Sequence, residues 1–349
     1  MSSIERTANP RNSSIEFLRI ISMIMVLILH ANFFSLGVPV KFDIISSPIH
    51  SIASIFIESL CLVAVNVFVL ISGWFGIRLS VKRIVGFVFQ VWFFLLVGAI
   101  IYMIINHSFK LPGGGKELIL SLLSPNYWFV KAYLILMLLA PIINCFLQYS
   151  TKQTILFVII ALFVFQSVWG FIFNTDWYSG GSSPISFVFL YLLAQYFRKY
   201  HSSSIKSGLC LIVYFCCSMA LTLIIICSTL LQRFSSINFL AYSNPLIILA
   251  SFCLFLPFTK HDYHNTIINY IATSAFAVYL FHCHYLLMQS YYVSHIQYLH
   301  DSLSTSVFLV RCALFLLLVF IASVFIDKLR IAAWNFLCRF YYRLRCLHF

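Results

Sequence analysis

The chain has 349 residues, of which 62% are hydrophobic and only 9% charged, and its mean hydropathy is +0.98. A soluble domain has about 45–50% apolar and about 25% charged residues, so this composition excludes a soluble fold with a polar surface. The net charge of +13 does not indicate nucleic-acid binding, because the basic residues are spread over many short loops. Most of the 11 cysteines lie inside apolar runs, where we expect them to pack as small apolar side chains instead of forming disulfides.

Apolar segments long enough to cross a bilayer recur along the whole chain. A spanning helix needs about 20 mostly apolar residues, and lipid favours helices because every backbone polar group must be satisfied internally. The expected fold class is therefore all-α: a polytopic transmembrane bundle in one domain, 1–349, whose first helix is not a cleaved signal peptide. Ten helices are predicted, at 15–36, 50–73, 84–106, 127–147, 154–173, 184–199, 207–231, 241–258, 267–293 and 305–327.

The basic residues predict the orientation of these helices. If the N-terminal segment, 1–14, is cytoplasmic, fifteen basic residues fall in inner segments and four in outer loops. The positive-inside rule then places both termini in the cytoplasm, with the basic tail, 329–349, on the inner leaflet. The inner set is Arg6, Arg11, Arg78, Lys82, Arg83, Lys152, Arg198, Lys199, Lys206, Lys260, Lys328, Arg330, Arg339, Arg343 and Arg345; the outer set is Lys41, Lys110, Lys116 and Arg233.

The first predicted helix carries ionisable residues at membrane depth, where they are costly and often functional. Arg19 and His30 are eleven residues apart, which is about 20° past three full turns, so they share one face. Arg19 is expected near the cytoplasmic end, where Glu16 can pair with it, and His30 near the outer end. Snorkelling to the interface is the alternative for Arg19, and an interfacial position is the alternative for His30.

Other predicted helices add polar candidates. In the second, Glu58 lies at a depth similar to that of His30 and can orient its imidazole, unless it faces the headgroups. The same helix holds Asn66 and ends in Ser72-Gly73, which permits close backbone approach.

The later predicted helices add aromatic, basic and histidine candidates. Trp128 belongs to an outer aromatic belt, and Lys131 lies deeper, either facing a cavity or snorkelling. His282 and His284 are about 200° apart on a helix, so we expect at most one of them at a given site. Zinc-ligand spacing, nucleotide-binding loops and a serine elbow do not occur, and no metal is expected.

Several of these segments together resemble the acyltransferase-three family. Arg19 and His30 are similar to its R/K-x10-H motif, and the segment 66–75 is similar to its FF-x-x-SGY/F segment, with Val67-Phe68-Val69 in place of paired phenylalanines. Lys82 and Arg83 fall where the family has basic residues before the third helix. Tyr127-Trp128-Phe129 with Tyr133 and Pro141, and Tyr279-Leu280-Phe281-His282, resemble two further segments. We expect the short type without an SGNH domain.

The resemblance implies an O-acyltransferase in a bacterial cell membrane, using acetyl-CoA as a co-substrate without a permanently bound cofactor. It implies that Arg19, Ser72, Lys82 and Arg83 bind the cytoplasmic acyl donor. The acceptor is then a hydroxyl of a surface polysaccharide or its lipid-linked precursor, with Asn66, Trp128, Lys131 and His282 in supporting positions. His30 is expected to act as general base or to carry the acyl group covalently. The alternatives are a transporter or flippase for a lipid-linked saccharide and a membrane sensor.

Overall fold

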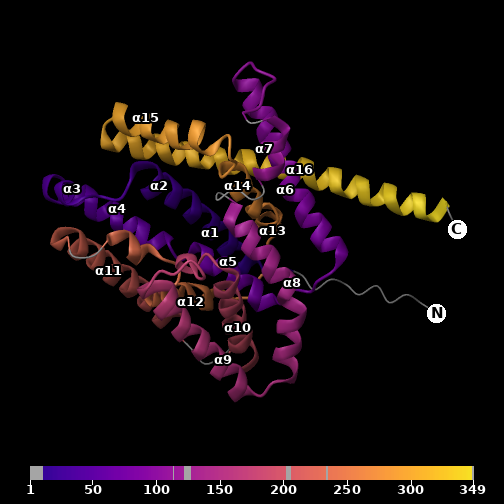
Figure 1. The fold of residues 1–349 in the computed structure, drawn as a ribbon, viewed down its shortest axis with the longest axis horizontal. Coiled ribbons are helices and arrows are strands. Elements are labelled where there is room, and N and C mark those ends of the chain that lie inside the picture. Colours follow the sequence, from indigo (N-terminus) through magenta and orange to yellow (C-terminus); the bar gives the residue numbers. More distant parts are fainter. Residues whose placement is uncertain (1–10, 113, 122–126, 202–205, 233–234, 348–349) are drawn as a thin grey trace.

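The computed structural model describes residues 11–112, 114–121, 127–201, 206–232 and 235–347, and all its regular elements are helices (Figure 1). The first half contains α1 (Ser13–Ala31), α2 (Phe33–Leu36), α3 (Lys41–Ser46), α4 (Pro48–Cys61), α5 (Ala64–Phe75), α6 (Val81–Ile105), α7 (Gly114–Leu120), α8 (Trp128–Tyr149), α9 (Lys152–Phe165), η3 (Gln166–Ile172) and η4 (Ser179–Gly181). The second half contains α10 (Pro184–Tyr200), α11 (Ser207–Leu231), η5 (Ser236–Leu240), α12 (Pro245–Lys260), α13 (Thr266–Ala272), α14 (Ala275–His282), η6 (Met288–Val293), α15 (Ser294–Ser302) and α16 (Thr305–Leu347). The predicted all-α class is confirmed.

Eight helical stretches within the described residues are long and apolar enough to cross a membrane. They correspond to eight of the ten predicted segments and confirm a multi-pass membrane protein. The two others form shorter helices: α10 has 17 residues, and the stretch Thr266–His282 is interrupted. The eight are Ser13–Leu36, Pro48–Phe75, Val81–Ile105, Trp128–Tyr149, Lys152–Ile172, Ser207–Leu231, Ser236–Lys260 and Thr305–Phe340.

Two predicted boundaries are wrong. The helix predicted at 267–293 is split into α13, α14 and the π-helical turn η6. The first break falls at Thr273, whose hydroxyl donates to the carbonyl of Tyr270 at 2.7 Å and so competes with the helical pattern. The last helix was predicted to end at 327, but α16 continues to Leu347, so the basic tail is a helical extension. Residues 1–10, Arg233 and the side chains beyond Phe340 lie outside the described part.

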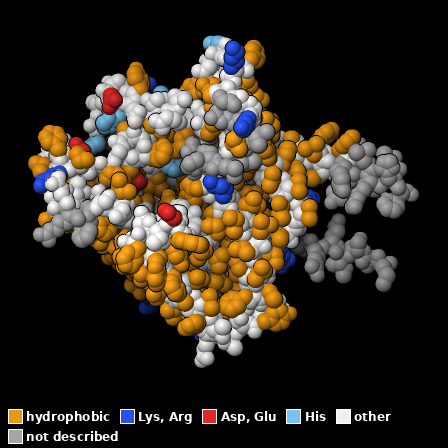
Figure 2. Space-filling model, in the orientation of Figure 1, with side chains coloured by type: hydrophobic (Ala, Val, Ile, Leu, Met, Phe, Trp, Pro, Cys, Tyr) orange, Lys and Arg blue, Asp and Glu red, His pale blue; other side chains and the backbone are white. Residues whose placement is uncertain are grey.

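The surface is that of a protein solvated by lipid. Figure 2 shows hydrophobic side chains covering much of the visible face over α8, α9 and α11. On α9, Phe157 is 72% exposed, and on α11, Ile212 is 60% exposed. Contiguous apolar exposure of this kind is rare on soluble monomers and is what a lipid-facing surface requires.

Helix α1 runs through the middle of the bundle, where it packs against α4, α5, α12, α13 and α14. Its Leu18 and Ser22 are fully buried, and the side chain of Asn12 caps its first turn by accepting the N–H of Ser14 at 2.9 Å. Because α1 is enclosed on several sides, polar side chains on it face the interior of the protein.

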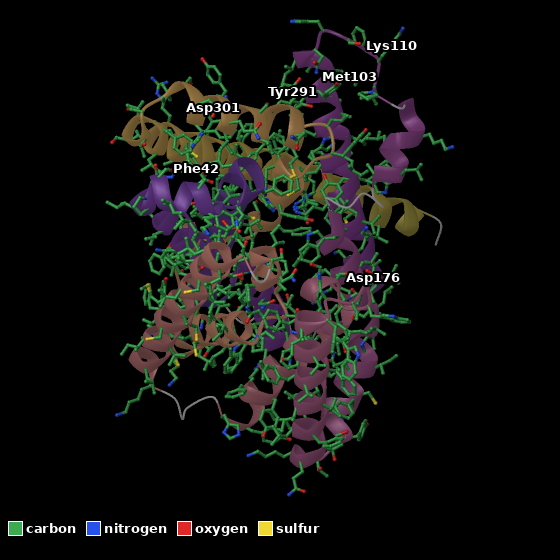
Figure 3. All side chains as sticks on the ribbon, turned by 60° about the vertical axis from the view of Figure 1, so that its left-hand side comes forward. Phe42, Met103, Lys110, Asp176, Tyr291 and Asp301 are labelled. Carbon is green, nitrogen blue, oxygen red and sulfur yellow. The ribbon has the colours of Figure 1, made fainter. Side chains whose placement is uncertain are left out.

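Segments with the same predicted side of the membrane lie at the same end of the bundle. At one end, the N–H of Ser13 donates to the carbonyl of Tyr263 at 2.9 Å, and Nζ of Lys328 donates to Oγ1 of Thr273 at 2.8 Å. All four belong to segments predicted to be at or near the cytoplasmic face. Phe42 of α3 lies near Asp301 of α15 at another end (Figure 3), and both were predicted outside. The arrangement fits the predicted alternation of loops between the two sides of the membrane, whereas the choice of which side is cytoplasmic stays a prediction from charge.

Candidate functional site

One face of α1 lines three cavities in series. Arg19, Met23, Val26 and His30 are spaced by four, three and four residues, so they form a stripe on a single helix face. Arg19 lines the first cavity, Met23 and Val26 line the second, and His30 lines both the second and the third. The predicted shared face of Arg19 and His30 is therefore present, and cavities follow it between them.

The first cavity has a volume of about 260 Å³ and lies at the predicted cytoplasmic end. Nη1 of Arg19 donates to Oε2 of Glu16 at 2.8 Å, which is the predicted pair. Oγ of Ser72 donates to the carbonyl of Phe68 at 3.0 Å and lies 3.2 Å from the hydroxyl of Tyr133. Arg19 and Ser72 thus line one cavity, whereas their role in binding the acyl donor stays a prediction.

Close packing of α5 against α10 fixes the position of Ser72. A Cβ on the neighbouring Gly73 would lie 2.8 Å from the carbonyl oxygen and 2.9 Å from Cα of Tyr191 on α10. Only glycine allows this approach, which is the backbone contact expected from Ser72-Gly73.

The predicted donor residues Lys82 and Arg83 do not line this cavity. Both are exposed at the start of α6, and Nη1 of Arg83 donates to the carbonyl of Arg78 at 2.7 Å. The charged groups that stand behind the cavity wall come instead from α16. Lys328 donates to the cavity residue Thr273, and the cavity residue Gln90 donates to Asp327 at 3.1 Å. The sequence reasoning missed these α16 residues because Asp327 is the last residue of the predicted final span and Lys328 was counted only as a basic residue of the inner side.

The imidazole of His30 is held by a second imidazole. Nδ1 of His30 lies 2.8 Å from Nε2 of His282, and Nδ1 of His282 bonds to the carbonyl of Val278. A carbonyl only accepts, so Nδ1 of His282 carries a proton, and in the neutral ring Nε2 then bears the lone pair. His30 must donate from Nδ1, which leaves its own Nε2 with a lone pair. Within the described residues that nitrogen makes no hydrogen bond.

Cys283 completes a cluster around the two histidines. Its Sγ lies 3.3 Å from Nε2 of His282 and 3.7 Å from Nδ1 of His30. These three ligand atoms lie within 4.8 Å of one another, so they could coordinate a cation, and the expectation of no metal stays a prediction. Sequence reasoning missed Cys283, although the polar run His282-Cys283-His284 in an apolar segment was a visible signal.

The end of α14 positions this cluster. The hydroxyl of Tyr127 donates to the carbonyl of Leu280 at 2.8 Å, and that of Tyr292 donates to the carbonyl of Leu27 on α1 at 2.7 Å. His284 lies beyond the end of α14 and has another partner: its Nε2 lies 3.1 Å from the carbonyl of Leu95 on α6. His282 alone therefore meets His30.

Glu58 lies near His30 but has a different partner from the predicted one. Oε2 of Glu58 accepts from Nδ2 of Asn32 at 2.8 Å, and Oδ1 of Asn32 accepts from the hydroxyl of Ser54 at 2.7 Å. The predicted orienting bond from Glu58 to His30 is replaced by the bond to His282. Sequence reasoning missed this because 252 residues separate the two histidines. Glu58 and His30 nevertheless line the same outer cavity.

The outer cavity has a volume of about 720 Å³ and is lined by loops as well as helices. Asp176, on the loop between η3 and η4, belongs to this lining. Trp128 stacks on Tyr242 with ring centres 5.7 Å apart, and Nδ2 of Asn66 donates to the carbonyl of Tyr242 at 3.1 Å. Asn66 thus supports the cavity wall from behind.

Among the predicted supporting residues, Trp128 lines the second and outer cavities, whereas Asn66 and His282 line none of the three. The same is true of Lys131. It lies on α8, three residues beyond Trp128, and is half-buried. Its predicted role stays open.

The second cavity lies between the other two and is much narrower, with a volume of about 40 Å³. It shares Phe68, Phe129 and Phe276 with the Arg19 cavity, and it shares Leu29, His30, Trp128 and Tyr242 with the outer cavity. The shared walls place the three cavities next to one another in one row along α1, with the smallest of them beside His30.

The site of this multi-pass membrane protein thus combines a cavity lined by Arg19, a pair of hydrogen-bonded imidazoles and a larger polar cavity. The family model described as "Acyltransferase domain" matches residues 12–327. The chain therefore belongs to the acyltransferase-three family, and this match supports a membrane acyltransferase over a transporter or sensor. Comparison with curated proteins and with solved structures gives no significant match.

Proposed function

We propose that this protein moves an acetyl group from cytoplasmic acetyl-CoA to a hydroxyl of a surface polysaccharide or of its lipid-linked precursor, in a bacterial cell membrane. The observation that carries the proposal is the row of three cavities along α1, with Arg19 at one end and His30 near the other. The polar residues of the row lie at its two ends, and its narrow middle is mainly apolar.

The Arg19 cavity is suited to the acyl donor. The guanidinium of Arg19 is half-buried and binds Glu16 through one nitrogen, so further N–H groups can bind phosphate oxygens of CoA. Eleven residues of helix separate Arg19 from His30, which is about 16 Å along the axis. An extended pantetheine arm can span this distance, which brings the thioester to His30 while the charged part of CoA stays at the cytoplasmic end.

At His30 the proposed reaction is direct acyl transfer. The lone pair of Nε2 removes the proton of the acceptor hydroxyl while its oxygen attacks the thioester carbonyl carbon. The carbon–sulfur bond breaks, CoA leaves as a thiolate, and the imidazolium returns the proton to it. The products are an ester and CoA, with no net proton change. His282 fixes the tautomer that this step requires, which makes it a positioning residue.

The alternative is that Nε2 of His30 attacks the thioester first and carries the acyl group covalently. Mixing the purified protein with labelled acetyl-CoA in the absence of acceptor, followed by acid quench and peptide mass spectrometry, separates the two. The direct mechanism leaves the peptide that contains His30 unlabelled, whereas a stoichiometric acetyl adduct would establish the covalent route.

The outer cavity is suited to a saccharide acceptor. Its volume of about 720 Å³ can hold a sugar unit, and its lining combines hydroxyl, amide and carboxylate groups with the stacked Trp128 and Tyr242. Aromatic faces and short polar side chains bind the apolar faces and hydroxyls of sugars. Glu58, beside His30 in this lining, is placed to accept a hydrogen bond from the acceptor.

The test is mass spectrometry of surface glycan from the native host carrying wild type or variants at equal membrane levels. We expect His30→Ala to lower acetylation by about 10²–10⁴-fold, the usual contribution of a general base. The control His295→Ala changes an exposed histidine on α15 that lines none of the three cavities. Full acetylation in His30→Ala would overturn the proposal, and loss of the whole glycan on gene deletion would favour a flippase.

The donor role of Arg19 needs its own measurement. Binding of acetyl-CoA to the purified protein in nanodiscs should weaken in Arg19→Gln. The control Arg311→Gln, at an exposed position on α16, should bind normally. Equal binding by both variants would remove Arg19 from the donor site.

A further inference from the structure

The narrow cavity beside His30 has room for only a few atoms. Its volume is about 40 Å³. On the same measure, a cavity needs about 10–15 Å³ to hold one water molecule, so this one has room for about three groups of that size. An acetyl group has a carbonyl carbon, a carbonyl oxygen and a methyl, which is about the same size.

The walls of this cavity are packed side chains that resist expansion. Met23 and Val26 of α1 and Val65 of α5 are 2%, 6% and 7% exposed. Phe129 stacks on Tyr133 with centroids 5.7 Å apart and an interplanar angle of 11°, and its edge meets Phe68. Since close-packed interiors deform little, a longer acyl chain would have to displace buried groups.

We propose that this cavity is an acyl-chain chamber, in which Met23, Val26 and Val65 set the length of the transferred acyl group and admit a two-carbon chain. The inference rests on the proposed function and adds the residues that select the donor. The charged part of CoA stays at the wider Arg19 cavity, so chain length is sensed only where the thioester meets His30. A propionyl or butyryl donor would then bind through CoA but would hold its carbonyl carbon away from Nε2.

Removing volume from the wall gives a direct test. Val65→Ala deletes two methyl groups from the chamber, and its matched control is Val67→Ala, on the same helix, fully buried and lining none of the three cavities. Met23→Ala enlarges the opposite wall. Because one methylene in an apolar pocket changes discrimination by about 10–200-fold, wild type should prefer acetyl-CoA over butyryl-CoA by at least about tenfold in transfer.

Native-host membranes that contain each variant are supplied with labelled acetyl-, propionyl- or butyryl-CoA, and acyl groups released from the glycan are weighed by mass spectrometry. We expect Val65→Ala and Met23→Ala to raise the butyryl-to-acetyl ratio about tenfold or more, with Val67→Ala unchanged. Equal use of all three donors by wild type, or an equal rise of the butyryl-to-acetyl ratio in Val67→Ala, would overturn the proposal that this cavity is an acyl-chain chamber. No transfer from any donor, together with no CoA binding, would instead overturn the proposed function.

Discussion

The bond between the two imidazoles leads to a quantitative prediction for His282→Ala. In the wild type, His282 accepts the Nδ1 proton of His30 at 2.8 Å and so favours the tautomer with a free Nε2. A hydrogen bond in a protein interior contributes about 0.5–1.5 kcal/mol net. That energy corresponds to a factor of about 2–13 in the tautomer ratio. Without His282, the ratio would shift by this factor toward the tautomer that carries its proton on Nε2, where it blocks proton abstraction.

The expected result is therefore a fall in acetyl transfer of up to about 13-fold for His282→Ala, smaller than the fall for His30→Ala. His282→Gln should recover part of the lost rate, because the amide oxygen of Gln can accept the Nδ1 proton. Binding of acetyl-CoA at the Arg19 cavity should stay normal in both variants. This measurement separates loss of positioning from loss of folding.

A double-mutant cycle tests the reasoning most directly. If His282 acts only through His30, the variant that lacks both should transfer at the rate of His30→Ala alone. The rates are measured as labelled acetyl incorporated into glycan by membranes with equal protein content. Independent, multiplying losses would refute the positioning role, as would wild-type transfer by His282→Ala.

Three further predictions follow from local packing and charge. A Cβ on Gly98 would lie 2.5 Å from Cδ2 of His284, whereas a Cβ on Gly86 would have its nearest neighbour at 3.4 Å. Thermal unfolding in detergent should therefore show that Gly98→Ala is destabilised by about 1–3 kcal/mol and that Gly86→Ala is nearly unchanged. Asp327 is fully buried and accepts a hydrogen bond from Nη2 of Arg330 at 2.8 Å. In the same unfolding measurement, Arg330→Leu should destabilise the protein by about 3–5 kcal/mol, and adding Asp327→Leu should restore much of that loss. A second, additive loss in the double variant would contradict a paired charge. Cys283→Ser should transfer acetyl groups at a rate within a few-fold of the wild-type rate. Elemental analysis of the purified wild type should find less than one metal ion per chain. Stoichiometric zinc together with chelator-sensitive activity would instead show that the cluster is a metal site.

The sequence predicts features that depend on local spacing. The helical class, the pair of Glu16 with Arg19, and the common face of Arg19 and His30 all follow from helix geometry and from the cost of polar groups in lipid. Each of these involves residues within a single helix.

Features that depend on packing between distant segments were missed or misassigned. Glu58 was predicted to be the partner of His30 because both residues lie at a similar depth in the membrane. Depth does not say in which direction each side chain points around its helix axis, and the imidazole of His30 meets His282 of α14 instead. The chain leaves the helix after His282, and His284 then meets the carbonyl of Leu95 on α6, a contact that no local pattern records. Lys82 and Arg83 were chosen for their position along the chain, whereas the cavity wall is backed by the extended α16.

The spacing of eleven residues between Arg19 and His30 has a physical explanation in the row of cavities. Two side chains share a helix face at separations near whole turns, which for an α-helix are about 7, 11 and 14 residues. Seven residues would place the imidazole about 10 Å from the arginine, and fourteen would place it about 21 Å away. Eleven gives about 16 Å, which leaves Arg19 at the wide inner cavity and His30 at the junction of the narrow and outer cavities. One residue more or fewer would turn His30 by about 100° and remove it from the cavity wall. The spacing of Arg19 and His30 therefore sets both the distance between the two side chains and the direction in which His30 points. The proposed reaction needs both, because the donor is held at Arg19 and reacts at His30.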